Sequence, residues 1–499
     1  MHPSTSSLWI ETQPAEPYPA LAGDITADVA VIGGGITGVT AALLLARAGR
    51  SVVLVEARRV GEVDTGHTTA HVTELLDTRY HTLISDFGEE GATMAAASQR
   101  AAIERIAAFI REERLECDFL RVPGFLYAET AEQEHEIERE AKAAVRVGLD
   151  ARIVRDTALP FPVRSALRVE DQAQFHPLRY LRPLAAALAR ESGARVFEHT
   201  RALDFEDGSP CRVVTDKGVI TARDVLVTTY SPVANKVFLH TKIAAYRTYA
   251  LAMRGQLAEG LYWDTADPYH YTRTQPYEGG QLLIVGGEDH KTGTERDTDA
   301  PFARLEAYAR ARFGDGPILH RWSGQILEPI DGLPFIGKNS ASKHTYVATG
   351  YAGNGMTSGT FAGMLLADLV RDASNPYAWL YDATRMKPIA GAATFLQENI
   401  DYPKHLIGDR LKPAEAHGFL EIAPGEGKIM TVNGHKLAVY RDESGGLTAL
   451  SPVCTHLGCH VTWNTAERSW DCPCHGSRFD TQGQVINGPS TKPLEQKPL

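Results

Sequence analysis

The sequence predicts a large α/β domain of the Rossmann type with an attached antiparallel sheet, followed by a small all-β domain. Residues 28–56 run from an apolar strand through a glycine turn and an Ala/Leu-rich helix into a second strand, which forms a βαβ unit. Residues 240–320 alternate aromatic and β-branched stretches with Gly, Pro and Asp, as antiparallel strands do. After residue 427, short strands are separated by Asn-Gly and Gly-Gly turns, which favour hairpins.

Length and composition restrict the class of protein. A chain of 499 residues exceeds what one hydrophobic core usually supports, so at least two domains are expected. Its 43% hydrophobic and 23% charged residues are typical of a fully folded globular protein. The net charge of −11 and the lack of Lys/Arg runs argue against a nucleic-acid partner. We find neither a secretory signal nor an apolar run of membrane-spanning length, so we expect a cytoplasmic protein with no membrane span.

The glycine turn fits a dinucleotide-binding fingerprint in its usual context, between a strand and a helix. Gly33 permits the tight turn, Gly35 the close approach of a pyrophosphate to the helix N-terminus, and Gly38 the packing of helix on strand. Glu56, at the end of the next strand, is placed to accept hydrogen bonds from ribose hydroxyls. The fingerprint alone fits FAD or NAD, and a purely structural glycine turn is the alternative.

The remaining patterns predict how the chain divides into domains. Helices are expected at 86–115, 131–147 and 179–192, and short strands follow the last of these up to residue 228. The predicted layout is a first domain at 1–370, with nucleotide-binding parts at 25–80, 175–235 and 320–370 and a substrate-side sheet at 240–320, then a linker at 371–414 and a second domain at 415–499.

Four side chains near the C-terminus form a pattern of metal ligands. Cys454 and His456 make a C-x-H pair, and Cys472 and His475 make a C-x-x-H pair after fifteen intervening residues. A Rieske [2Fe–2S] cluster needs two cysteines on one iron and two histidines on the other, a ligand set that raises its reduction potential. A structural Cys₂His₂ zinc site is the alternative.

The residues around these ligands favour the Rieske cluster over zinc. Cys459 lies in C-T-H-L-G-C-H and Cys474 in C-P-C-H-G-S, and both segments closely resemble the Rieske domains of respiratory and photosynthetic cytochrome complexes. The resemblance covers residues 415–499. It implies a Cys459–Cys474 disulfide and a hydrogen bond from Ser477 to a bridging sulfide, which should raise the potential. Phe479 stands where a tyrosine that donates to a ligand sulfur is expected, so the potential should be lower than in those complexes.

The first domain resembles the D-amino-acid oxidase/glycine oxidase family of FAD-dependent oxidoreductases. The resemblance covers about residues 8–370, its opening is especially similar to the gamma-glutamylputrescine oxidoreductase branch, and it favours FAD over NAD. No second dinucleotide fingerprint is visible, which argues against a built-in NAD(P)H site. The segments that carry the resemblance are 27–61, 65–69, 177–181, 322–325, 331–334 and 350–356.

The resemblance implies a set of cofactor-binding residues. The segment 65–71 should lie beside the flavin ring, and the loop 353–356 should face its pyrimidine edge. His71 lies where the dimethylglycine dehydrogenase branch has a histidine covalently bonded to FAD, with hydrogen bonding near the flavin or plain packing as alternatives. The expected FAD contacts are Gly33, Gly35, Ile36, Thr37, Gly38, Glu56, Ala57, Arg58, Thr65, Gly66, His67, Thr68, Thr69, Ala202, Trp322, Gly324, Gly353, Asn354, Gly355 and Met356.

Aromatic and ionisable side chains gather in the region expected to face the substrate. Besides His71, the catalytic candidates there are His270, Tyr271 and Arg273, of which Arg273 could hold a carboxylate with two hydrogen bonds. The alternative is that the tyrosines fill a sheet face and Arg273 pairs with a surface acid.

Together the two resemblances imply an amine or amino-acid dehydrogenase. A hydride from the carbon next to the nitrogen would pass to the flavin, and the cluster would take electrons one at a time to an external acceptor, a protein or quinone-type carrier, through an exposed histidine-ligated edge. One alternative is an electron-transfer module that serves a partner oxygenase or reductase. Another is a Rieske domain that acts as a redox sensor or cap.

Overall fold

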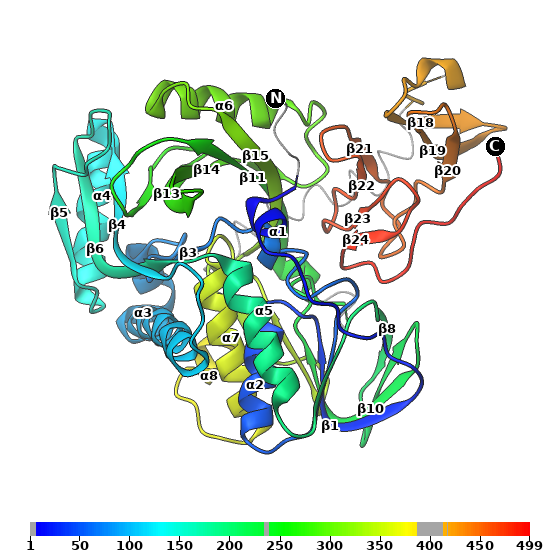
Figure 1. The fold of residues 1–499 in the computed structure, drawn as a ribbon, viewed down its shortest axis with the longest axis horizontal. Helices are drawn as coiled ribbons and strands as arrows, with labels where there is room; N and C mark the ends of the chain where they lie inside the picture. The colour runs from blue at the N-terminus through cyan, green and yellow to red at the C-terminus, as the bar shows by residue number, and fades with distance from the viewer. Residues whose placement is uncertain (1–5, 234–238, 387–412, 417) are drawn as a thin grey trace.

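The computed structural model describes residues 6–233, 239–386, 413–416 and 418–499, which form a large lobe and a small C-terminal lobe (Figure 1). Two β-sheets with helices packed against them make up the large lobe, and residues 415, 416 and 418–499 make up the small one. The predicted fold class is confirmed: an α/β nucleotide-binding domain, an associated second sheet and a small all-β domain.

The first sheet of the large lobe is a mostly parallel sheet with the strand order β16-β17-β10-β1-β2-β7, and β9 and β8 extend from β10. Alternate residues of β1 enter two different hydrophobic clusters, Val31 on one face and Ile32 on the other, so the strand is covered on both sides. Helices α2, α5 and α7 pack together beside this sheet (Figure 1). The elements are β1 (Ile25–Ile32), α2 (Ile36–Arg47), β2 (Val52–Val55), α5 (Pro177–Arg190), β7 (Ala194–Phe197), β8 (Ala202–Glu206), β9 (Cys211–Thr215), β10 (Val219–Val227), β16 (Phe335–Lys338), β17 (Thr345–Thr349) and α7 (Gly355–Val370).

The second sheet has the order β15-β11-β14-β13-β12-β4-β6-β3, with β5 paired to β6. Its neighbours are antiparallel except for β12 and β4, which run parallel. Helix α6 packs on β11 and β14, and α4 packs on β4, β5 and β6. The elements are β3 (His71–Val72), β4 (Leu120–Ala128), α4 (Ala131–Arg146), β5 (Ala151–Val154), β6 (Ser165–Gln174), β11 (Ile243–Arg254), β12 (Leu261–Trp263), β13 (His270–Tyr277), β14 (Gly280–Lys291), α6 (Ala300–Phe313) and β15 (Ile318–Pro329).

Helices α3 and α8 differ from the boundaries that the sequence patterns predicted. The long helix α3 (Tyr80–Glu113) is kinked at Gly88, whose φ of 74° lies outside the helical region. Helix α8 (Ala378–Tyr381) falls within the predicted linker, yet Tyr381 is fully buried and its hydroxyl lies 2.7 Å from Ser98 Oγ. The first part of segment 371–414 therefore packs on the large lobe, while its residues 387–412 lie outside the described residues.

Two small antiparallel sheets form the C-terminal lobe, in the orders β18-β19-β20 and β21-β22-β23-β24. Trp470 and Phe479 are completely buried in its core. The three strands expected from the Asn-Gly and Gly-Gly turns are present. The strands are β18 (Gly427–Val432), β19 (His435–Arg441), β20 (Leu447–Leu450), β21 (Thr462–Asn464), β22 (Ser469–Asp471), β23 (Arg478–Phe479) and β24 (Val485–Asn487).

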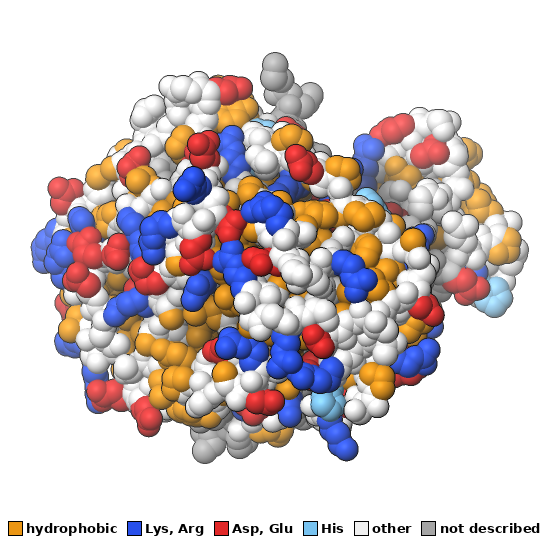
Figure 2. Space-filling view, turned by 60° about the horizontal axis from the view of Figure 1, so that its bottom comes forward, with side chains coloured by type: hydrophobic (Ala, Val, Ile, Leu, Met, Phe, Trp, Pro, Cys, Tyr) orange, Lys and Arg blue, Asp and Glu red, His pale blue; other side chains and the backbone are white. Residues whose placement is uncertain are grey.

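The molecular surface agrees with the charge pattern of the sequence. Acidic and basic side chains are interspersed on the face shown in Figure 2, and no broad basic patch is seen there. Within the described part of the chain, none of the helices has both the length and the apolar character needed to cross a bilayer.

Candidate functional site

The glycine turn between β1 and α2 has a geometry that only glycine satisfies at two positions. Gly33 has a φ of 110°, and a Cβ there would lie 2.7 Å from the Thr228 carbonyl oxygen. A Cβ on Gly38 would overlap the Gly33 carbonyl oxygen. Gly35 is the N-cap residue of α2, so the turn presents the first N–H groups of that helix at the edge of a cavity. This arrangement fits the pyrophosphate of a dinucleotide.

Glu56 lies beside this turn and lines the same cavity. Its carboxylate accepts hydrogen bonds from the N–H groups of Gly34, at 2.8 Å, and Arg58, at 2.9 Å. Burial raises the pKa of Glu56 and outweighs these two hydrogen bonds. The carboxylate is thus fixed by the backbone at the position where a ribose acceptor is expected.

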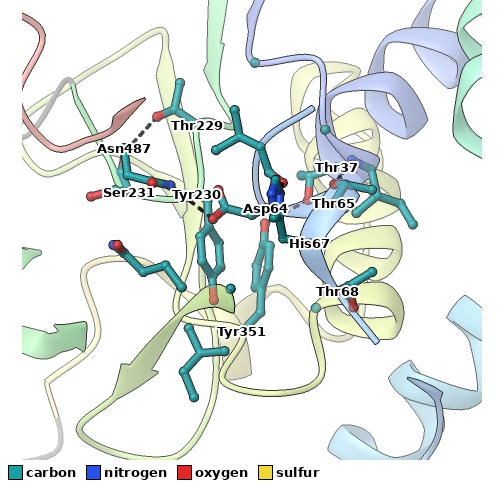
Figure 3. Close-up of a pocket in the computed structure, with 18 of the residues that line it drawn as sticks. Thr37, Asp64, Thr65, His67, Thr68, Thr229, Tyr230, Ser231, Tyr351 and Asn487 are labelled. Atoms are coloured by element: carbon teal, nitrogen blue, oxygen red, sulfur yellow. Dashed lines mark hydrogen bonds between the residues drawn. The ribbon is translucent and has the colours of Figure 1, made fainter. Parts of the chain in front are cut away.

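One large cavity brings together most of the residues expected to contact FAD. Figure 3 shows side chains from several separate segments converging on it. The expected residues that line the cavity are Gly33, Gly35, Ile36, Thr37, Glu56, Ala57, Thr65, His67, Thr68, Thr69, Ala202, Gly324, Gly353, Asn354, Gly355 and Met356.

Four expected FAD contacts do not line the cavity and instead support residues that do: Gly38, Arg58, Gly66 and Trp322. Trp322 is buried and donates from Nε1 to the His67 carbonyl oxygen at 2.9 Å. A Cβ on Gly66 would overlap the Gly61 carbonyl oxygen. Gly38 lies directly against the Gly33 carbonyl oxygen, and the Arg58 N–H donates to the Glu56 carboxylate. The motifs therefore mark segments that border one cavity, but they do not distinguish residues that face the cavity from those that position them.

The structure contradicts the prediction that Arg273 holds a substrate carboxylate. Its side chain is fully buried and does not line the cavity. The guanidinium donates to the carbonyl oxygens of Thr69, Phe175 and Thr274 at 2.6–3.0 Å. Burial lowers the pKa of Arg273 to about 9. The N–H groups of Arg273 already bind backbone carbonyl oxygens. They therefore hold the segment that follows Thr68 in place and are not free to bind a ligand carboxylate. The alternative of pairing with a surface acid is also wrong.

His270 likewise does not line the cavity, contrary to its predicted catalytic role. Its ring stacks on Tyr308 with 3.8 Å between centroids, and its nitrogens lie 3.0 Å from Asp264 Oδ2 and 3.3 Å from Glu288 Oε1. Successive residues of a strand point to opposite faces, so His270 faces helix α6 while Tyr271 faces the cavity.

His71 and Tyr271 do line the cavity, from β3 and β13. Their ring centroids are 5.5 Å apart. His71 Nδ1 lies 3.2 Å from Thr69 Oγ1, whereas its buried Nε2 has no hydrogen-bond partner among the described residues. Burial lowers the pKa of His71 to about 3, so the imidazole is neutral. A catalytic or covalent role for His71 stays a prediction.

The cluster-binding segments form two loops with matching backbone geometry. In each loop the N–H of the first cysteine donates to the residue five positions later, Cys454 to Cys459 and Cys472 to Ser477, both at 2.8 Å. The rings of His456 and His475 lie 4.9 Å apart. The two loops thus supply two thiols and two imidazoles, which is the donor set of a Rieske cluster.

Hydroxyl groups and a disulfide surround the proposed ligands. Cys459 and Cys474 form a disulfide that joins the two loops. The Ser477 hydroxyl oxygen is buried and accepts from the N–H of Ser490 at 3.1 Å. The Ser490 hydroxyl lies 3.4 Å from Cys454 Sγ. Sequence reasoning missed Ser490, because this third loop approaches the cysteine only in the folded domain.

A buried network of charges joins the two lobes. The guanidinium of Arg247, only 2% exposed, lies 2.8 Å from both carboxylate oxygens of Glu467, and the Ser323 hydroxyl donates to one of them. Arg478 donates to the same carboxylate at 2.8 Å and to Asp471 at 2.9 Å. The Rieske lobe is thus held in a defined position against β11 and β15.

This position turns the proposed histidine edge of the cluster toward the large lobe. The His240 ring lies 4.6 Å from the ring of His456 and 5.7 Å from that of His475. All three rings are at least partly buried. The histidine edge, which we expected to be exposed, is therefore only partly exposed, because the large lobe packs against it.

The Rieske lobe also forms part of the wall of the large cavity. Asn487 Nδ2 donates to Asp64 Oδ1 at 3.3 Å across the boundary between the lobes (Figure 3). The contributing residues are Ile486, Asn487, Gly488, Ser490 and Thr491. Ser490 thus lines the cavity and contacts Cys454, so the two proposed cofactor sites share a wall.

Two family models match the chain. One described as FAD dependent oxidoreductase matches residues 28–369, and one described as Rieske [2Fe-2S] domain matches residues 417–498. The chain therefore belongs to the FAD-dependent oxidoreductase family, carries a C-terminal Rieske domain and binds FAD and a [2Fe–2S] cluster.

Known proteins resemble both the whole chain and its parts. The putative Rieske 2Fe-2S iron-sulfur protein YhfW of Bacillus subtilis is 36% identical over 495 residues, which cover 98% of this chain and 97% of that protein. Gamma-glutamylputrescine oxidoreductase of Escherichia coli is 26% identical over 381 residues, covering 71% and 86%. The structure of glycine oxidase from Geobacillus kaustophilus covers 72% of this chain and 99% of its own, with a TM-score of 0.63 at 18% identity, which shows a shared fold. The predicted family resemblance is confirmed.

Proposed function

We propose that this protein is a dehydrogenase that oxidises a C–N bond of an amine or amino acid and passes electrons singly through its Rieske cluster to an external acceptor. When bound, FAD supplies a two-electron hydride acceptor and the cluster a one-electron carrier. The observation that carries the proposal is the shared wall, in which Ser490 both lines the flavin cavity and contacts the cluster ligand Cys454. A cap or sensor would not need this proximity.

Residues of the cavity wall can exclude water and bind an amine nitrogen. Tyr271 and Trp263 supply apolar walls that exclude water from the reacting carbon. Since His71 is neutral and its Nε2 lacks a partner among the described residues, this atom can accept a hydrogen bond from a substrate N–H. Such a contact would orient the carbon next to the nitrogen.

An external acceptor needs access to the cluster from a side that the large lobe leaves open. Because His456 and His475 face the large lobe, the loop around Cys454 is the better candidate. Its neighbour Val453 is 38% exposed, and Thr455 is also exposed. We therefore place the electron exit, to a protein or quinone-type carrier, at this loop. The cytoplasmic location stays a prediction.

The test is anaerobic reduction of the purified protein. We expect one or more members of a panel of amines and amino acids to bleach the flavin absorbance, followed by the electron paramagnetic resonance signal of a reduced Rieske cluster. A Cys472→Ser variant, which loses a cluster ligand, should still bleach without giving that signal. Reduction by a partner protein or NAD(P)H, with no response to any amine, would instead support the electron-transfer module.

A further inference from the structure

Residues 485–491 of the Rieske lobe are hydrogen-bonded to the large lobe beside the nucleotide-binding part of the cavity. In the middle of this segment, Asn487 donates to Asp64. At its start, the Val485 carbonyl oxygen accepts a hydrogen bond from the Arg201 guanidinium at 3.1 Å. Most of the segment lines the cavity, and so does Arg201. The Rieske lobe therefore contacts an arginine of the cavity wall directly.

Arg201 lies in the part of the wall where the nucleotide is expected. It directly precedes β8, and the N–H of its neighbour Thr200 donates to the Glu56 carbonyl oxygen at 2.9 Å. Glu56 is the residue placed to bind the ribose hydroxyls. Among the described residues, Arg201 is the only Lys or Arg that lines the cavity. The cationic side chain of this wall therefore lies beside the expected position of the adenosine.

The half-buried guanidinium of Arg201 forms no ion pair within the described part of the chain, and its hydrogen bond goes to a neutral carbonyl oxygen. Burial lowers the pKa of Arg201 and the charge of Arg58 adds to this effect, while Glu56 and Asp216 act in the opposite direction. Asp216 binds the backbone N–H of Arg201 at 2.8 Å and not the guanidinium. A partly buried cation gains stability from contact with an anion or an aromatic face, and FAD offers both, in its phosphates and its adenine.

We propose that Arg201 binds the adenosine half of FAD and that the Rieske lobe positions it for this role through the Val485 carbonyl oxygen. The proposal goes beyond the dehydrogenase proposed above and does not depend on it. The guanidinium has five N–H donors, so those that do not bind Val485 can donate to oxygens of the nucleotide. The Rieske lobe then has a second task besides electron transfer, which is to keep the nucleotide in its site.

Cleavage of the bound cofactor by a phosphodiesterase tests the proposal on the complete protein without turnover. The phosphodiesterase hydrolyses the pyrophosphate of FAD to FMN and AMP, and it reaches the bond only when the adenosine half leaves its site, whether or not the flavin is covalently attached. Arg201→Gln can still donate to Val485 but has lost the charge, so we expect it to release AMP at least about tenfold faster. Arg212→Gln, on β9 with a side chain 50% exposed, is the matched control and should release AMP at the unaltered rate.

A second substitution separates binding of the nucleotide from a structural role. Arg201→Lys keeps the positive charge, so it should protect FAD better than Arg201→Gln does. If both variants release AMP equally fast, the arginine acts only on the structure and the proposed contact is wrong. An unchanged rate in Arg201→Gln also overturns it. Loss of FAD from Arg201→Gln during purification, with the cluster retained and Arg212→Gln keeping its flavin, supports the proposal as faster cleavage does.

A charge exchange tests the contribution of the Rieske lobe. Burial raises the pKa of Asp64 to about 7, so the measurement is made at pH 8, where this carboxyl group is ionised. Asn487→Asp then sets two carboxylates against each other and should raise the rate of AMP release at least about threefold. Adding Asp64→Asn restores a donor and an acceptor and should slow the release again. If Asn487→Asp leaves FAD fully protected, the Rieske lobe does not hold the nucleotide. No amine enters these measurements, so they succeed or fail independently of the proposed dehydrogenase.

Discussion

Replacing Glu467 by glutamine tests how firmly the Rieske lobe is attached. The Glu467 carboxylate contacts Arg247 and Ser323 of the large lobe and Arg478 of its own lobe. Glutamine keeps the shape of the side chain and removes its charge. Arg247 and Arg478 would then be buried with no charge to balance them at this point, which is the costly part of breaking a buried ion pair.

The expected loss of stability can be worked out from the pKa of the Glu467 carboxyl group. Burial raises the pKa of Glu467, but the guanidinium groups of Arg247 and Arg478 outweigh it and lower the pKa from 4.5 to about 2. At about 1.4 kcal/mol per pKa unit, the folded state gains about 3 kcal/mol from the ionised form. Breaking a buried pair usually costs about 3–5 kcal/mol, which agrees. Since the folded pKa is depressed, this stability is fully present above pH 4.5 and is lost as pH falls through 2.

The visible circular dichroism of the cluster follows unfolding of the Rieske lobe. A loss of about 3 kcal/mol should lower its Tm by more than about 10 °C. The rate at which the cluster is reduced after flavin bleaching should fall as well, because the lobe no longer keeps one position. Glu443→Gln breaks an exposed pair with Arg468 and should change the stability by less than about 1 kcal/mol. If Glu467→Gln and Glu443→Gln behave alike in both measurements, the lobes are not held together by this network.

Three further predictions concern the cofactor sites. Ser490→Ala removes a hydrogen bond of about 1 kcal/mol to Cys454, so the cluster potential should fall by about 40 mV in a redox titration, and an unchanged potential would rule the contact out. Gly38→Ala forces a side chain against Gly33, so the purified protein should lack flavin absorbance but keep its cluster signal. Cys459→Ser opens the disulfide and should lower the Tm of the Rieske lobe, consistent with a loss of about 2–4 kcal/mol, whereas full retention would show that the loops hold without it.

The sequence predicted those parts of the fold that depend on residues close together in the chain. The glycine turn, the strand before it and Glu56 after it lie within one βαβ unit, and the first two hairpins of the C-terminal lobe follow from short glycine-containing connections, 433–434 and 442–446. The order of strands in the second sheet depends on contacts between distant segments, such as the parallel pairing of β4 with β12. No local pattern encodes that pairing.

In the candidate site, too, local patterns predicted some residues, whereas others come together only in the folded chain. The four proposed cluster ligands have a diagnostic spacing, whereas Ser490 reaches Cys454 from 36 positions away in the chain. Arg273 and Tyr271 lie in one strand segment, and only the tyrosine faces the cavity. Strand alternation separates His270 from Tyr271 but puts Arg273 on the same face as Tyr271, so only the folded structure shows that Arg273 lies outside the cavity wall.

The contribution of Ile486 to Thr491 to the flavin cavity bears on how the protein matures. These residues follow all other cavity-lining residues in the chain, so they are the last part of the cavity wall to be synthesised. Once it docks, Asn487 contacts Asp64 and closes that side of the cavity. We therefore expect the nucleotide to bind before the C-terminal lobe closes this side of the cavity.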